Sequence, residues 1–199
     1  KDGTVYFTDD IQLAVNAGAK DGATVTLLDN IAINTLYIYN RSHALTIDGN
    51  GKSVTVSLPK QGDFAFNFEG ANVVVKNLTI NAKFDGIKVL GTSHVVLKDC
   101  NVYASNTKPG EHVEGDWAQS GGALKVDQST KAYVEIDGGN YKASGTRTTD
   151  AETGKVKYTG NTFMDIRQGR LVIKGGNFDD YNCNAMVQAG AGLTQPEAD

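Results

Sequence analysis

The 199-residue sequence contains little cysteine, proline, histidine or tryptophan, and each scarcity narrows the class of protein. Its two cysteines, Cys100 and Cys183, belong to no CxxC motif and have no histidine pair beside them, so there is no zinc signature. With three histidines, the chain offers few groups for acid–base chemistry near neutral pH. No run approaches the roughly 20 apolar residues of a membrane-spanning helix, and we expect no direct membrane insertion.

The charge and the two ends of the sequence carry further expectations. A formal net charge of −4 gives no reason to expect nucleic acid or anionic lipid as a partner. The sequence begins at Lys1 rather than at a methionine and has no signal peptide, and residues 189–199 have the Gly/Ala/Pro content of a linker or tail. We therefore expect a piece of a longer, exported protein.

What the sequence does contain is a repeat. Five segments share an alternating apolar run followed by a polar residue and a small or turn-forming residue, and the last four add another apolar residue. Their aligned apolar anchors are Ile47, Val75, Leu97, Ile136 and Ile173. Self-similarity at irregular spacing predicts an all-β parallel solenoid in which insertions are carried by some coils.

The first residues predict a cap for this stack. Residues 4–8 favour a strand, and Thr8 is a suitable N-cap for a short helix that places Ile11 and Val15 on one face and ends by residues 20–22. Such a helix could cover the open end of a solenoid. We therefore predict one β-helix domain over 1–188, with a cap at 1–22 and coils at 23–188.

Two further patterns are expected within the coils. A second set of short apolar strands, each beside an anchor strand, indicates at least two strands per turn; its members are residues 86–89, 123–126, 163–166 and 185–187. Phe64, Phe66 and Phe68 alternate and should share an inner face. Three asparagines fall at one aligned position and should form a hydrogen-bonded ladder inside the coil: Asn101, Asn140 and Asn177.

Cys100 occupies the position that Leu78, Gly139 and Gly176 hold in other repeats. We expect it to be a small buried side chain. A disulfide with Cys183 is left open, although stacked coils would separate the two residues.

The first insertion, residues 105–121, contains His112, Glu114, Asp116 and Trp117, the only tryptophan. An exposed indole beside carboxylates could stack on a sugar ring or lie beside a hard cation such as calcium. Alternatively, Trp117 tucks under its own loop and the acids only solvate it. We expect no cofactor, and calcium is the one ion considered.

The second insertion, residues 144–161, contributes Arg147 and Tyr158. Both insertions follow matching Tyr-Ala-Ser and Tyr-Lys-Ala-Ser sequences, so we expect them to leave the same corner of successive coils. Together with Trp117, these two side chains could line a ligand-binding groove. The alternative is a solvated hairpin with mixed charges.

Few residues are placed for catalysis. His43 and His94 precede strands at corners, and adjacent residues such as Asp179–Asp180 point to opposite faces of a strand, which makes a poor glycosidase pair. Asp165 and Arg167 should form an outward salt bridge. We predict no catalytic residues.

The coils, the Asp48-Gly-Asn-Gly-Lys52 turn and the preceding helix together resemble the right-handed parallel β-helix, or pectin-lyase-like, superfamily over residues 5–188. The Gly-Gly-Asn-Tyr/Phe strand ends look like those of non-catalytic cell-surface β-helix modules of Gram-positive and gut bacteria. The lyase stretch Arg-x-Pro-x-x-Arg is absent, and of the polygalacturonase boxes only Asp179–Asp180 is present. The resemblance therefore implies a fold and no activity.

The sequence favours a non-catalytic β-helix module of an exported bacterial surface protein, extracellular or at the cell surface. It would act as a stalk or adhesive domain for a polysaccharide, host glycan or host protein. One alternative is a polysaccharide-active enzyme, either a lyase or a glycoside hydrolase. Another is a phage or toxin fragment that assembles with neighbours. The oligomeric state is not predicted.

Overall fold

The computed structural model describes residues 6–19, 22–39, 43–57, 64–105, 122–127, 129, 131–144, 147–158, 160–179 and 183–189. These residues form one short helix, α1 (Ile11–Gly18), and strands that lie in two large parallel sheets and one small hairpin. The hairpin consists of β13 (Arg147–Thr149) and β14 (Val156–Tyr158).

The nine-stranded sheet contains β1 (Thr24–Thr26), β2 (Ile31–Ile33), β4 (Leu45–Asp48), β5 (Ser53–Val56), β7 (Asn72–Lys76), β8 (Thr79–Ala82), β10 (His94–Ser105), β12 (Tyr133–Ser144) and β16 (Arg170–Asp179). The six-stranded sheet contains β3 (Leu36–Tyr39), β6 (Phe64–Glu69), β9 (Asp85–Leu90), β11 (Leu124–Asp127), β15 (Gly160–Ile166) and β17 (Cys183–Ala189).

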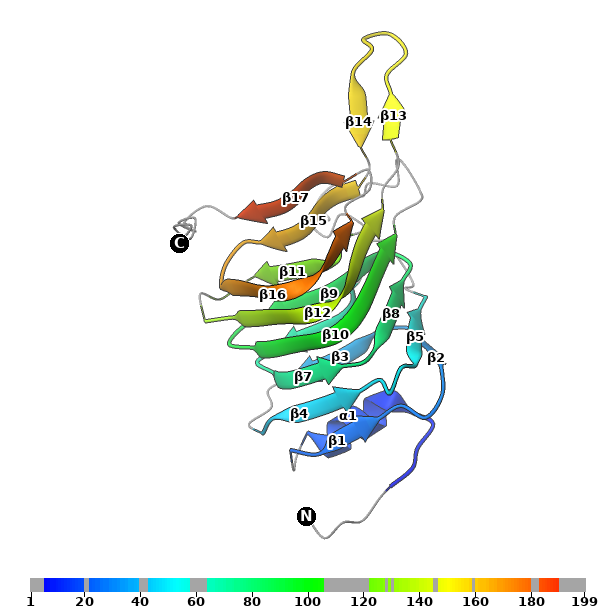
Figure 1. Ribbon diagram of the computed structural model, residues 1–199, viewed down its shortest axis with the longest axis vertical. Helices are drawn as coiled ribbons and strands as arrows, with labels where there is room; N and C mark the ends of the chain where they lie inside the picture. Colours follow the sequence, from blue (N-terminus) through cyan, green and yellow to red (C-terminus); the bar gives the residue numbers. More distant parts are fainter. Residues whose placement is uncertain are drawn as a thin grey trace.

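The chain visits the two sheets in a repeating order. Two strands of the nine-stranded sheet are followed by one strand of the six-stranded sheet, three times in succession from β1 to β9. From β10 onward, one long strand takes the place of the first two, and β10 pairs with both β7 and β8. Every pairing within the two large sheets is parallel, and successive strands lie above one another (Figure 1). This arrangement agrees with the all-β parallel solenoid that the repeat predicts.

The strand register confirms the alignment of the five segments. Ile47 pairs with Val75, Val75 with Leu97, Leu97 with Ile136, and Ile136 with Ile173. The first four side chains are fully buried, but Ile173 is 46% exposed. The expectation that Ile173 lies inside the stack is therefore wrong, because β16 pairs only with β12 within the described residues.

The bend between the two halves of each long strand depends on left-handed backbone. Asn77, Asp99 and Gly138 follow the paired positions of three successive strands and have φ values of 51°, 48° and 85°. Gly139 also has a positive φ of 90°, and a Cβ placed there would collide with the carbonyl oxygen of Cys100. Asparagine, aspartate and glycine are the residues that adopt this conformation at low cost, so the polar and small residues of the repeat fix the bend.

Helix α1 lies against β1, β3 and β4 at the N-terminal end of the stack, as predicted for a cap (Figure 1). Its buried side chains are Ile11 and Val15. The N-cap is Asp10 rather than Thr8: the Asp10 carboxylate accepts hydrogen bonds from the backbone of Gln12 and Leu13. Of the expected strand at residues 4–8, the described part, residues 6–8, belongs to no sheet.

The asparagine ladder is present. Asn101 Nδ2 donates to Thr79 Oγ1 (3.1 Å), Asn140 Nδ2 to Asn101 Oδ1 (2.7 Å), and Asn177 Nδ2 to Asn140 Oδ1 (3.0 Å). Its location differs from the expected one, since Asn140 and Asn177 are exposed and the ladder runs along the outside of the bend. Its three hydrogen bonds tie β8, β10, β12 and β16 together along the stack.

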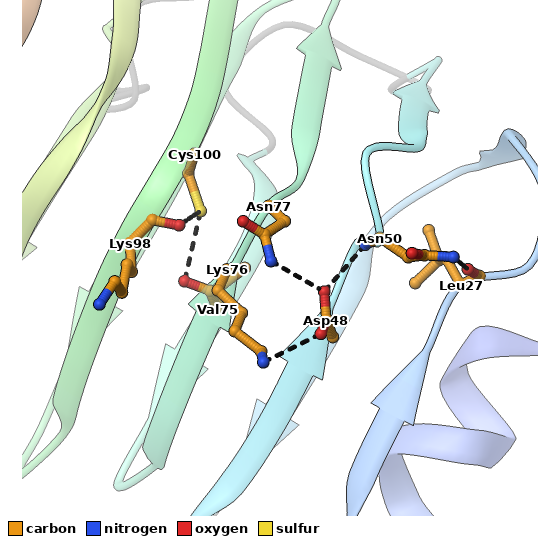
Figure 2. A network of polar contacts seen from close by, with 8 residues as sticks. All are labelled: Leu27, Asp48, Asn50, Val75, Lys76, Asn77, Lys98 and Cys100. Atoms are coloured by element: carbon orange, nitrogen blue, oxygen red, sulfur yellow. Dashed lines mark hydrogen bonds and ion pairs between the residues drawn. The ribbon is translucent and has the colours of Figure 1, made fainter.

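A second polar network joins the first coils (Figure 2). The Asp48 carboxylate accepts hydrogen bonds from Asn50 N (2.9 Å) and Asn77 Nδ2 (3.3 Å) and pairs with Lys76 Nζ at 3.0 Å. Burial raises the pKa of Asp48, but the hydrogen bonds from Lys76, Asn50 and Asn77 outweigh it, so the pKa of this carboxyl lies below its ordinary value.

Cys100 belongs to the same corner and is a free, buried thiol, as the repeat position predicts. Its Sγ lies 3.3 Å from the Val75 carbonyl oxygen and 3.4 Å from that of Lys98 (Figure 2). Burial raises the pKa of this thiol to about 12, which keeps it protonated and unreactive.

Candidate functional site

The residues that the sequence predicts for the loop groove are only partly described. His112, Glu114, Asp116 and Trp117 lie outside the described residues. Only the backbone is described for Arg147 and Tyr158, which face each other as register partners in the antiparallel β13–β14 hairpin. This hairpin projects beyond the two parallel sheets (Figure 1).

The strands that flank the two insertions are nevertheless well placed. Ser105 and Ser144, where the insertions start, are register partners of β10 and β12. After the first insertion, the chain is held by the buried Asp85, whose Oδ1 accepts a hydrogen bond from Gly122 N (2.9 Å). The insertions return to β11 and β15, which pair with each other in the six-stranded sheet. The described residues that follow the two insertions therefore lie side by side in the six-stranded sheet.

On the outer face, one residue from each of the strands β3, β6, β9, β11 and β15 lies in register. Alternate positions such as Phe66, Ile87 and Leu124 fill the core, so the residues between them face outward. We call these the outer row: Tyr37, Asn67, Lys88, Lys125 and Asp165.

Two stacked tyrosines lie at the first end of the outer row: Tyr37 belongs to the row, and Tyr39 stands two residues farther along the same face of β3. The rings of Tyr37 and Tyr39 are stacked, with centroids 5.6 Å apart and an interplanar angle of 8°. They are 40% and 42% exposed, respectively. Because both rings stand on the outer face of β3, this stacked aromatic pair is accessible to solvent.

Lys88 occupies the middle of the outer row. Its Nζ lies over the ring of Phe64, 5.4 Å from the centroid. Phe66 and Phe68 pack in the continuous core, whereas Phe64 is buried apart from it. All three rings are thus buried as expected, and Phe64, at the edge of the core, also contacts an outward cation.

Lys125 is the most unusual residue of the outer row. Only 9% of its side chain is exposed, and its Nζ lies 3.7 Å from Asp127 Oδ2, too far for a hydrogen bond. Burial lowers the pKa of this lysine, and the nearby Arg167 lowers it further, while Asp165 and Asp127 act in the opposite direction. A lysine this buried, with no hydrogen-bond acceptor in the described part of the chain, is uncommon.

Asp165 follows Lys125 in the outer row and forms the predicted pair with Arg167. Its Oδ2 accepts a hydrogen bond from Arg167 Nε (2.9 Å). Its Oδ1 is buried and has no hydrogen-bond partner. One carboxylate oxygen is therefore left as an acceptor beside the amine of Lys125.

A second polar cluster lies on the nine-stranded sheet, and its Tyr133, Glu135 and Lys174 side chains are paired with one another. The ring of His94 contacts Tyr133 edge-on at 4.7 Å, Tyr133 donates to Glu135 (2.9 Å), and Lys174 binds Glu135 (2.7 Å). Because these groups satisfy one another, we interpret the cluster as surface stabilisation. Asp179 is ion-paired with Lys142 at 2.9 Å, and Asp180 lies outside the described residues.

The outer row combines an aromatic surface with closely spaced donors and acceptors, an arrangement suited to holding an extended polar molecule. Among the described residues, no group of three or more His, Cys, Asp or Glu side chains could hold a metal ion. No helix in the described ranges is long and apolar enough to cross a bilayer.

The sequence did contain signals for this site. Lys88, Lys125 and Asp165 are the central residues of the second strand set, and Tyr37 and Tyr39 alternate around a buried isoleucine. Each of them is outward-facing in a strand with a buried alternate face. What the spacing could not reveal is that Lys125 is buried on that outer side.

Comparisons of the chain with family models, with curated proteins and with solved structures find no match in any of the three. A fold made of parallel sheets does not by itself name a superfamily, because one fold can host many unrelated functions. The function must therefore be argued from the outer row.

Proposed function

We propose that this chain is a right-handed parallel β-helix module of an exported bacterial surface protein, located outside the cell, that binds a glycan without modifying it. The observation that carries the binding function is the outer row, in which two stacked, exposed tyrosines continue into in-register polar side chains. The sequence resemblance supports the β-helix, the export and the pectin-lyase-like relationship.

The chemistry of the outer row suits a sugar chain. A pyranose ring has an apolar C–H face, which packs on an aromatic surface such as Tyr37 and Tyr39, and a rim of hydroxyl groups that form hydrogen bonds. Asn67, Lys88 and Asp165 supply donors and acceptors farther along the row. Because neighbouring strands are about 4.8 Å apart, the four strand steps of the row span roughly 19 Å, a length that several sugar units would cover.

The main ligand contacts in this proposal lie on the six-stranded sheet rather than in the two insertions. His112, Glu114, Asp116, Trp117, Arg147 and Tyr158 belong to insertions that start at the ends of β10 and β12 and continue into β11 and β15, which carry Lys125 and Asp165. We keep these six residues as candidates for additional ligand contacts near the outer row. A calcium ion at the first insertion also stays a proposal.

The binding function can be tested with a tyrosine double variant. Binding to a panel of plant, fungal and mammalian glycans would be measured for the native chain and for Tyr37→Ala/Tyr39→Ala. The matched control is Tyr103→Ala, which removes an exposed tyrosine from the nine-stranded sheet. We expect the double variant to lose at least tenfold in affinity while the control binds normally, and both should keep the native melting temperature.

Two results would overturn the proposal. One is the absence of glycan binding by the native chain. The other is binding that survives in the double variant but is lost in Trp117→Ala, which would return the site to the first insertion.

One observation favours a second candidate, a polysaccharide lyase or glycoside hydrolase. Lys125 has a lowered pKa and lies beside the Asp165 carboxylate, so the pair could in principle transfer a proton. Incubation with pectin, alginate and neutral polysaccharides, with and without calcium, would reveal a lyase by rising absorbance and a hydrolase by new reducing ends. Activity that Lys125→Met abolishes would replace the non-catalytic proposal.

A further inference from the structure

We infer that Lys125 and Asp165 form a subsite for an uncharged, hydroxyl-rich sugar unit, so that the glycan is neutral rather than uronic. This inference rests on the proposed glycan-binding function and names the ligand class. It follows from three features of the outer row: unmet hydrogen-bonding capacity, the spacing of the two groups and the local balance of charge.

The first feature is unmet hydrogen-bonding capacity of opposite kinds. The Lys125 ammonium has three N–H donors and no hydrogen-bond acceptor among the described residues; its nearest carboxylate oxygen is 3.7 Å away. The buried Asp165 Oδ1 has no donor. Buried polar atoms are nearly always paired in folded proteins, so the unpaired Asp165 Oδ1 next to the Lys125 side chain indicates a place for a ligand.

The second feature is the spacing of the two groups. Lys125 and Asp165 are register partners on adjacent parallel strands, so their backbones are about 4.8 Å apart. A hydroxyl group between the two side chains could accept a hydrogen bond from Lys125 Nζ and donate one to Asp165 Oδ1. Only a group that both donates and accepts satisfies both partners, and sugar hydroxyls have this property.

The third feature is the balance of charge around the subsite. Two cationic side chains, Lys125 and Arg167, are interspersed with two carboxylates, Asp127 and Asp165. Lys88 on the next strand adds a third cation, whose Nζ lies over the Phe64 ring. A uronate bound here would be attracted by Lys125 but repelled by Asp165. A positively charged amino sugar would be attracted by Asp165 but repelled by Lys125. The cost of removing a charged ligand from water is then not offset, whereas a neutral sugar avoids that cost. The lowered pKa of Lys125 agrees with a site that disfavours excess charge.

The aromatic end of the outer row fits the same ligand. Tyr37 and Tyr39 present ring faces without a charged residue of their own strand between them, since the intervening Ile38 is buried. Stacking on these rings does not depend on ligand charge. Specificity for neutral over uronic glycans therefore depends on Lys125 and Asp165.

The test compares neutral and charged polymers on the same protein. Affinity electrophoresis and calorimetry would use glucan, mannan and galactan as neutral probes, polygalacturonate and alginate as uronic probes, and chitosan as a cationic probe. We expect at least one neutral polymer to bind roughly tenfold or more tightly than any charged one. We expect Lys125→Met and Asp165→Asn each to weaken that binding about tenfold, as loss of a hydrogen bond to a charged group would.

Matched controls come from the other sheet. Lys98 and Asp137 form an exposed pair at 3.9 Å on the nine-stranded sheet, so Lys98→Met and Asp137→Asn make the same chemical changes away from the outer row. Both should leave binding unchanged. Thermal unfolding of all four variants separates misfolding from loss of the subsite, and Asp165→Asn keeps the shape of the side chain if Lys125→Met is unstable.

The possible failures are distinguishable. Tighter binding of a uronic polymer, or neutral binding that depends on Tyr37 and Tyr39 but not on Lys125 or Asp165, would overturn the inference and leave the glycan-binding function intact. Absence of binding to every polymer would overturn both.

Discussion

The side-chain amide of Gln12 pairs with the backbone of Tyr37 as a neighbouring strand would. Gln12 Nε2 donates to the Tyr37 carbonyl oxygen (2.8 Å), and Gln12 Oε1 accepts from the Tyr37 N–H (3.0 Å). Strand β3 pairs only with β6 within the described sheet, so this amide satisfies one residue of a free edge. Helix α1 thus caps the stack both by apolar burial and by mimicking a peptide group, which protects the edge from pairing with other chains.

Replacing Gln12 by alanine should therefore loosen β3 without unfolding the helix. The two hydrogen bonds to Tyr37 and an exposed one to Asn16 Oδ1 (3.2 Å) are lost, and we expect unfolding to become easier by about 1–2 kcal/mol. Hydrogen exchange at the Tyr37 amide should rise more than exchange elsewhere in the sheet. Leu13→Ala, an exposed position of the same helix, is the control and should change neither measurement appreciably.

Substitution of Gly139 tests the bend of the long strands. Gly139→Ala would combine a positive φ with a collision against the Cys100 carbonyl, and we expect a loss of about 3–5 kcal/mol in the free energy of unfolding. Gly154→Ala in the β13–β14 turn has a positive φ but nothing within 4 Å. It should cost at most about 1–2 kcal/mol in urea denaturation. Equal losses at both positions would show that close stacking at the bend is not what requires glycine.

The anchor positions differ in burial, and their tolerance of charge should differ accordingly. Asp in place of Val75, Leu97 or Ile136 would leave an unpaired carboxylate in the core and should cost about 3–5 kcal/mol. Ile173→Asp, at the exposed β16, should cost about 1 kcal/mol or less. Thermal unfolding of the four variants is the measurement. A loss of stability at Ile173 as large as at the other three anchors would contradict its exposure.

Acid should remove the contribution of Asp48 to stability. Because its pKa is lower in the folded chain than the ordinary value near 3.9, ionised Asp48 stabilises the fold above about pH 4. That stability is lost as the pH falls through the lowered folded value. The difference in unfolding free energy between the native chain and Asp48→Asn should thus be largest near neutral pH and shrink below about pH 4. The exposed Asp29→Asn is the control, and a difference that grew on acidification would contradict this assignment.

Much of the fold could be predicted because a parallel stack repeats its side-chain requirements. Ile47, Val75, Leu97 and Ile136 meet the same core in successive coils, so the sequence itself aligns them. The asparagine ladder follows for the same reason, since identical residues in register can hydrogen-bond along the stack. The exposure of Ile173 could not be predicted, because it depends on what lies on the next level of the stack.

The candidate site was harder to predict for a physical reason. Packing in the core constrains only the inward-facing side chains of a strand. The alternating pattern therefore says only that Lys88, Lys125 and Asp165 face outward. The burial of Lys125 and the unpaired Asp165 Oδ1 are three-dimensional properties that no spacing reveals. Trp117 and its acidic neighbours lie outside the described residues, so their part in the site stays a prediction.

The most direct measurement is nuclear magnetic resonance of the ¹⁵N-labelled chain during titration with a neutral oligosaccharide. Binding along the outer row should shift amide signals of β3, β6, β9, β11 and β15 together, beginning at Tyr37 and ending near Asp165. Shifts confined to the β13–β14 hairpin, to the nine-stranded sheet or to the loops, or no shifts with any neutral oligosaccharide, would contradict it.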